Sequence, residues 1–92
     1  MNTIVATRSF VGRTLERGEF DIMGAVGMPY PCGEGEWACP VFLTPLFDQL
    51  PDIRGVDSFQ ALSLALKLIH SLLEGFIEQG GTLFFDGEKF TP

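Results

Sequence analysis

The chain has 92 residues, a formal net charge of −6 and nine phenylalanines, and 46% of its residues are hydrophobic. Because disordered acidic segments are poor in apolar residues, this composition excludes disorder as the main state. The length predicts a single domain over residues 1–92. Mean hydropathy is positive at +0.23, so the sequence must place many acidic side chains around an apolar interior.

The charge pattern disfavours nucleic acids and membranes as partners. Six basic residues stand against twelve acidic ones and are scattered along the chain, whereas phosphate groups and anionic lipids are bound by clustered cations. The sequence shows neither a signal peptide nor an unbroken apolar run of about 18 residues. We therefore expect a cytosolic protein, and its two cysteines are too few for a disulfide framework.

Three strands are predicted in the first half of the chain. Residues 3–11 are β-branched and aromatic, residues 20–28 alternate with period two, and residues 12–18 form the hairpin connection between them. Pro29 and Pro31 end the second strand, and residues 32–36 are expected to be a loop. Residues 37–43 read as a third strand in which Pro40 favours an edge position or a bulge, and residues 45–55 are irregular.

One long helix is predicted over residues 58–79. Asp57 and Gln60 have the spacing of a capping box, and Gly80 and Gly81 supply a left-handed end. Polar residues occupy one arc of about 100°, and the apolar side is about twice as wide as that of an ordinary surface helix. We expect such a helix to be covered on more than one side.

The end of the chain completes an α+β prediction. Residues 82–85 and 89–90 flank Asp86-Gly87, a strong short hairpin signal. The expected fold is a mostly antiparallel β-meander of three strands packed on one long α-helix, with a C-terminal strand or hairpin.

Residues 55–62, with the sequence GVDSFQAL, resemble the Gly-x-Asp-x-x-Gln-Ala-Leu helix start of a family of short bacterial proteins of unknown function. In that family too, a β-meander with a tryptophan-to-cysteine stretch, here residues 37–39, precedes the helix. The resemblance implies a bacterial origin and the α+β fold, and it implies no activity, cofactor or catalytic residue. The chain departs from the pattern at Pro40.

No cofactor or metal is predicted. Residues 33–38 match the letters of a dinucleotide fingerprint, but they lack the preceding strand and the following helix, and Glu34 and Glu36 would repel a pyrophosphate. Cys32 and Cys39 are further apart than the usual cysteine pairs of zinc sites, which need four ligands.

An enzyme remains the alternative hypothesis. A cysteine nucleophile would need His70 within hydrogen-bond reach and a group that orients the imidazole, for which Glu74 lies one turn further along the helix. The sequence does not show whether Cys39 approaches His70. A small enzyme or ligand-binding domain would then have its pocket between sheet and helix, near His70, Cys39 and Tyr30.

The wide apolar side of the helix favours a non-enzymatic protein-interaction module. Large exposed apolar patches seldom persist on monomers, so the simplest partner is a second copy in a twofold homodimer. Aromatic side chains carry interface energy well, and the candidate anchors are Tyr30, Trp37, Phe59 and Phe76. Two other interpretations stay open: the sheet and residues 43–50 cover the helix, or the acidic surface covers a basic site as an antitoxin-like inhibitor does.

Overall fold

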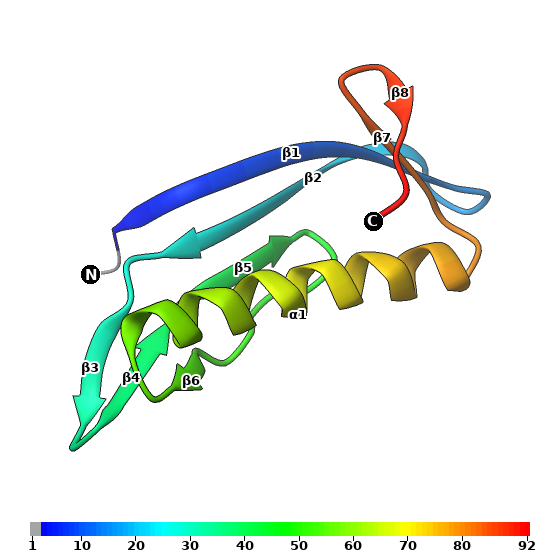
Figure 1. Cartoon of the computed structure of the whole chain (residues 1–92). Coiled ribbons are helices and arrows are strands. Elements are labelled where there is room, and N and C mark those ends of the chain that lie inside the picture. The colour runs from blue at the N-terminus through cyan, green and yellow to red at the C-terminus, as the bar shows by residue number, and fades with distance from the viewer. Residues whose placement is uncertain (1–2) are drawn as a thin grey trace.

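The alternating residues of the first half of the chain form strands, and the long apolar segment forms a helix, in a computed structural model that describes residues 3–92 (Figure 1). The elements in chain order are β1 (Ile4–Thr14), β2 (Gly18–Gly27), β3 (Tyr30–Gly33), β4 (Glu36–Cys39), β5 (Val41–Thr44), β6 (Ile53–Gly55), α1 (Ser58–Glu78), β7 (Thr82–Phe85) and β8 (Glu88–Lys89). One sheet has the order β5-β2-β1-β7-β8, and the other has the order β3-β4-β6. The predicted α+β class is confirmed, with more strands than the three-stranded meander.

The long β1–β2 hairpin forms the central part of the larger sheet. Its strands pair antiparallel from Ile4↔Gly27 to Thr14↔Gly18, and Gly18 closes the turn with a φ of +69°. The predicted connection over residues 12–18 is therefore too long. Arg13 and Glu19 lie opposite each other on adjacent strands. These charged residues therefore belong to the paired strands and not to the turn. The hairpin gives the molecule its elongated shape, 47 × 23 × 22 Å.

Pro40 separates two sheets, and the prediction of one strand over residues 37–43 is wrong. β4 pairs with β3 and β6, whereas β5 pairs with β2. Proline has no N–H to give to a ladder, but its carbonyl accepts from the Gly27 amide at 2.9 Å. A Cβ at Gly27 would lie 2.9 Å from the Pro40 ring, so this crossing requires a glycine.

The expected loop over residues 32–36 is a hairpin. β3 and β4 pair from Tyr30↔Ala38 to Gly33↔Glu36, and Gly35 provides the turn with a φ of +68°. The proline at position 31 is tolerated because β3 is the edge strand of its sheet.

Both ends of α1 follow the sequence prediction. The Asp57 carboxylate accepts from the Gln60 amide at 2.7 Å, and the Gln60 side chain reaches back to the Val56 amide at 2.8 Å, one residue earlier than the capping box implies. At the other end, Gly80 has a φ of +101°, and the Gly81 amide donates to Phe76 O at 3.0 Å.

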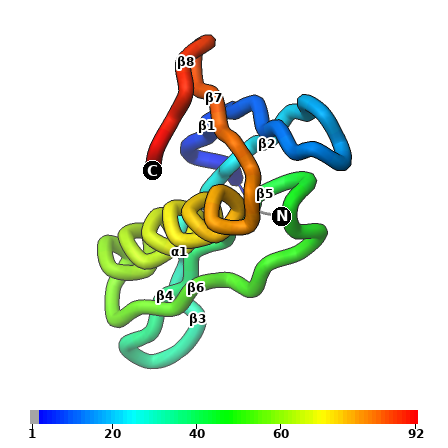
Figure 2. Tube along the Cα trace, turned by 90° about the vertical axis from the view of Figure 1, so that its right-hand side faces the viewer, coloured from blue at the N-terminus to red at the C-terminus, as the bar shows by residue number. Residues whose placement is uncertain are grey.

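The core has two clusters joined by α1. One gathers around Phe10, Ile22, Leu43, Leu73 and Leu83. The other contains Val26, Cys39, Val41, Ala61 and Ala65. Figure 2 shows α1 with the long β1–β2 hairpin on one side and the smaller sheet on the other. Each fully buried leucine contributes about 1.5–3 kcal/mol to folding.

Only three residues of α1 are buried, namely Ala61, Ala65 and Leu73. By length and composition, α1 is the one helix of residues 3–92 that could span a membrane, and only 17% of its most apolar window is buried. The expectation that the chain does not enter a membrane therefore stays a prediction. Of the apolar side chains of α1, Phe59, Leu64 and Leu66 are exposed. Most of the others are half-buried against the two clusters, namely Leu62, Leu68, Ile69, Leu72, Phe76 and Ile77.

A glycine at the start of α1 provides a test of this packing. A Cβ on Gly55 would lie 2.6 Å from the backbone nitrogen of Ala61, so Gly55→Ala must push the helix away from β6. We expect a loss of about 1–3 kcal/mol in the free energy of unfolding, measured with urea.

Gly75→Ala is the matched control. Nothing lies within 4 Å of the position that its new methyl group would occupy, and alanine replaces glycine inside a helix, so we expect stabilisation by about 0.5–1 kcal/mol. Equal effects of the two substitutions would contradict a close approach at Gly55.

Candidate functional site

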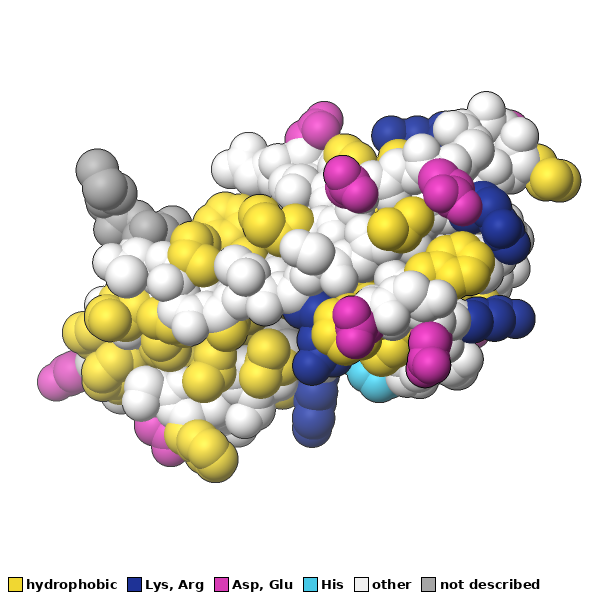
Figure 3. All heavy atoms as spheres, turned by 90° about the horizontal axis from the view of Figure 1, so that it is seen from above, with side chains coloured by type: hydrophobic (Ala, Val, Ile, Leu, Met, Phe, Trp, Pro, Cys, Tyr) yellow, Lys and Arg dark blue, Asp and Glu magenta, His cyan; other side chains and the backbone are white. Residues whose placement is uncertain are grey.

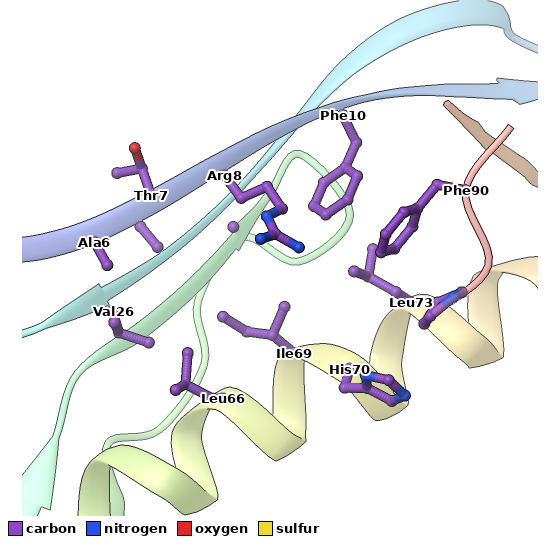
Figure 4. A pocket seen from close by; sticks show the side chains of 13 residues that line it. Ala6, Thr7, Arg8, Phe10, Val26, Leu66, Ile69, His70, Leu73 and Phe90 are labelled. Atoms are coloured by element: carbon purple, nitrogen blue, oxygen red, sulfur yellow. The ribbon is translucent and has the colours of Figure 1, made fainter. Parts of the chain in front are cut away.

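A groove of about 300 Å³ lies between the first half of β1 and α1. Figure 4 shows Ala6, Arg8 and Phe10 pointing from β1 toward the helix, while Leu66 and Ile69 point back toward the sheet. These β1 side chains share one face because successive side chains of a strand alternate.

The last residues of the chain close one end of the groove. Phe90 and Pro92 belong to its lining, and the Phe90 ring lies 5.2 Å from the Phe10 ring, centre to centre. Phe90 is held there by its amide, which donates to Leu83 O at 2.8 Å. The opposite end, at the beginning of β1 and α1, is open.

The charges of the groove lie at its mouth. The Arg8 guanidinium carbon lies 4.9 Å from the centre of the Phe85 ring. His70 Nε2 lies 3.5 Å from Glu74 Oε1, in the i,i+4 pair expected from the sequence, and both side chains are more than half exposed. Such an exposed pair stabilises the helix by about 0.5 kcal/mol or less.

The predicted pocket residues do not all meet. His70 lines the groove, but Cys39 is not part of the lining and has no exposed surface. The Cys39 thiol donates weakly to Gly27 O at 3.4 Å. Burial raises the pKa of this thiol, and the Asp52 carboxylate raises it further, which is opposite to what a nucleophilic cysteine needs. The geometry supports a core role for Cys39.

The four predicted anchors lie on three different parts of the surface. The Tyr30 hydroxyl donates to the Asp52 carboxylate, which raises the pKa of the phenol. Trp37 is half-buried against the cluster around Cys39. Phe76 is half-buried and meets the Phe20 ring edge-on at 6.1 Å.

Phe59 is the most exposed of the four anchors, with 77% of its surface exposed against 38% for Tyr30. It precedes the groove on the same side of α1 as Leu66, which is 50% exposed and lines the groove. Ile4, at the start of β1, is 45% exposed. Figure 3 shows hydrophobic side chains gathered over the half of this face where β1 and α1 begin. We call Ile4, Ala6, Phe59 and Leu66 the open apolar side.

Sequence reasoning missed the β1 part of this surface. Alternation in residues 4–10 does predict that Ala6, Arg8 and Phe10 share a face, but it also predicts that the helix covers that face. Exposure of Ala6 and Arg8 depends on where α1 crosses the sheet, and this is fixed by its contacts with β6, which directly precedes it, and with β4 and β5, which lie further back in the sequence.

The fold and groove thus define a small α+β domain with a long hairpin and an incompletely covered sheet. Residues 6–91 match a family model described as Domain of unknown function (DUF6968), and the chain belongs to this family. No curated protein and no solved structure matches the chain. Membership of an uncharacterised family confirms part of the resemblance noted above, while the bacterial origin and the helix-start motif stay predictions.

The two cysteines should differ strongly in reactivity. Both are free, and only Cys32 is exposed. With a thiol reagent at pH 8, we expect one fast-reacting thiol per chain and a second that reacts only when the protein unfolds. Because burial and the Asp52 carboxylate raise its pKa, Cys39 carries less thiolate than a free cysteine at pH 8, and its enclosure in the core slows its reaction further.

Cys32→Ser serves as the control for this assignment. It should remove the fast phase and leave the slow one unchanged. A fast phase that persists in Cys32→Ser would contradict the buried role of Cys39 and restore the nucleophile hypothesis.

Proposed function

We propose that this domain is a non-enzymatic protein-interaction module that associates with a second copy of itself through the open apolar side. The observation that carries this proposal is the exposure of Phe59 and Leu66 beside an apolar groove. Complete burial of one such side chain contributes about 1.5–3 kcal/mol to the free energy of association. The monomer, in which these side chains stay exposed, does not gain it.

The distribution of charge supports an apolar contact. Within the described residues, the groove lining contains Arg8 and His70 as its only ionisable side chains, whereas the chain as a whole carries −6. Two acidic copies repel each other at long range, and salt screens that repulsion within about 10 Å at 0.1 M. Association through the open apolar side should therefore strengthen as salt is added.

The arrangement of the cysteines supports a role without covalent catalysis. Cys39 is enclosed in the core and Cys32 lies in β3, so neither belongs to the groove that contains His70. Two free cysteines also support the proposed cytosolic location, where thiols stay reduced.

Leu66→Glu tests the proposed contact. The substitution places a carboxylate on the open apolar side, and its desolvation in the dimer is costly even with Arg8 and His70 in the same groove. In sedimentation equilibrium at several concentrations, we expect wild-type protein to dimerise and Leu66→Glu to raise the dissociation constant at least about tenfold.

Leu64→Glu is the matched control. Leu64 is 36% exposed and lies about 200° around the helix from Leu66, so it gains the same charge on the opposite side. Dimerisation should persist in Leu64→Glu. A wild-type chain that stays monomeric at millimolar concentration, or equal weakening by both substitutions, would overturn the proposal.

A second candidate function is the binding of a small amphipathic acid in the groove. It is favoured by the combination of an apolar lining with Arg8 and His70 at the mouth. The volume of about 300 Å³ is at the lower end of the range for ligand pockets, and suits a single short chain with a carboxylate head.

Decanoate is a suitable probe for this candidate. In NMR titrations, we expect shifts confined to groove residues and about fivefold weaker binding for Arg8→Gln, since an exposed ion pair contributes about 1 kcal/mol.

Arg13→Gln is the control for the charge of Arg8. Arg13 stacks on the Phe84 ring and lies outside the groove lining, so its substitution should leave the affinity unchanged. Shifts spread over the whole surface, or equal weakening by both substitutions, would reject the ligand candidate.

A further inference from the structure

The first half of β1 has one unpaired edge. β2 pairs along one side of β1, but β7 pairs along the other side only from Val11 to Arg13. Among residues 3–92, no strand accompanies Val5–Ser9 on that side. Figure 1 shows β7 crossing the hairpin only at its far end, and Figure 2 shows the same strand departing from β1.

The hydrogen-bond pattern identifies the backbone groups on this edge. Leu83 lies opposite Gly12, but its carbonyl accepts from Phe90 on the β8 side. Antiparallel pairs alternate between bonded and non-bonded residues, so Val11 and Arg13 are the residues of β1 that bond to β7. By the same alternation, Thr7 and Ser9 direct their N–H and C=O groups to the unpaired edge.

The hydrogen bonds of β2 lead to the same assignment of the odd-numbered and even-numbered residues of β1. The Gly27 amide donates to Pro40 at the start of β5, so the odd-numbered residues of β2 face β5 and the even-numbered ones face β1. Gly24 lies opposite Arg8, and Arg8 therefore bonds to β2. The register shift between Ile4 and Ala6 limits the regular part of the edge to residues after Val5.

The residues of this edge are suited to strand pairing. Proteins usually protect a free edge with proline, inward charges or a covering segment. Residues 5–9 contain neither proline nor glycine, and Arg8 is their only charge. Arg8 points toward α1, with its guanidinium over the Phe85 ring of the same chain, and this single inward charge is the one such protection among residues 5–9.

We propose that the unpaired edge of β1 pairs antiparallel with the same edge of a second copy, with Thr7 opposite Thr7 of that copy. This inference rests on the proposed self-association and specifies its backbone contact. The two larger sheets become one continuous sheet across a twofold axis, and both α1 helices lie on the same face of it.

The alternation of side chains restricts the register. Residues that lie opposite each other in a ladder share a face, and even-numbered residues of β1 face α1, so an even-numbered residue must meet an even-numbered one. With Thr7 at the axis, Arg8 meets Ala6 of the second copy, which leaves room for its long side chain. A shift by two residues toward the hairpin turn would place Arg8 opposite Arg8, and like charges in that position are destabilising.

The free length of the edge favours a second copy over another extended segment. On one side the register shift near Ile4 ends the regular ladder. On the other, Phe85 occupies the space beside Phe10, with their ring centres 5.9 Å apart. The remaining regular stretch, residues 6–9, contains Thr7, so two copies paired at Thr7 meet over residues 6–8 without displacing either C-terminal hairpin. The second copy's Ala6 then lies beside the mouth of the groove.

Thr7→Pro removes the amide that this pairing needs. The Thr7 amide is not part of the β1–β2 ladder, and proline is tolerated where an edge N–H faces solvent, so the fold should persist by circular dichroism. We expect the dimer dissociation constant to rise at least about tenfold. Thr7→Ala, which removes the same side chain but keeps the amide, should dimerise as the wild type does.

A disulfide test checks the register directly in a Cys32→Ser background. Bonded antiparallel partners have Cα atoms about 5.5 Å apart, within the range of a disulfide, so Thr7→Cys should form a covalent dimer on mild oxidation. Ser9→Cys should not, because the two Ser9 positions are offset by four residues, about 14 Å along the strands.

The outcomes separate this inference from the proposed function. A dimer that is insensitive to Thr7→Pro, or that crosslinks through Ser9→Cys as fast as through Thr7→Cys, would overturn the β1 pairing while self-association stands. If wild-type protein and all variants are monomeric, both proposals fail. Loss of the dimer in Thr7→Pro together with Leu66→Glu, with a Thr7→Cys crosslink, supports both.

Discussion

The close contact between the start of α1 and β6 is the constraint on which the rest of the structure depends. Gly55 lies so near the helix backbone at Ala61 that no side chain fits between them, and Ala65, one turn further along, is small and fully buried as Ala61 is. This contact draws α1 toward the smaller sheet. The helix is consequently not centred over the long hairpin, and the first half of β1 keeps an open face. Its edge is open as well, because β7 pairs only with Val11–Arg13.

The local parts of the fold could be predicted from the sequence because their causes are local. Asp57 and Gly80 limit the helix through bonds to residues a few positions away, and Asp86-Gly87 turns the last hairpin with both residues at positive φ. The pairing partners of the segments around Pro40 could not be predicted. A proline indicates where a ladder stops, but the choice of a new sheet for residues 41–44 depends on β2, more than ten residues earlier.

The candidate site shows the same division between local and distant causes. The pattern of α1 correctly indicates more apolar surface than one contact can bury, and Phe59 is exposed as an anchor should be. The same pattern does not distinguish Phe59 from Phe76, which packs against Phe20 of the hairpin. Nor does it show that Cys39 enters the core instead of facing His70, because that depends on the sheet to which β4 belongs.

The elongated hairpin has a consequence for how the protein behaves in solution. With one dimension of 47 Å and two near 22 Å, a monomer meets more hydrodynamic friction than a sphere of equal mass. Gel filtration, which reports a radius, would assign it too large a mass and could mistake shape for assembly. Measurements that report mass independently of friction, such as sedimentation equilibrium or light scattering, are the ones that can count its chains.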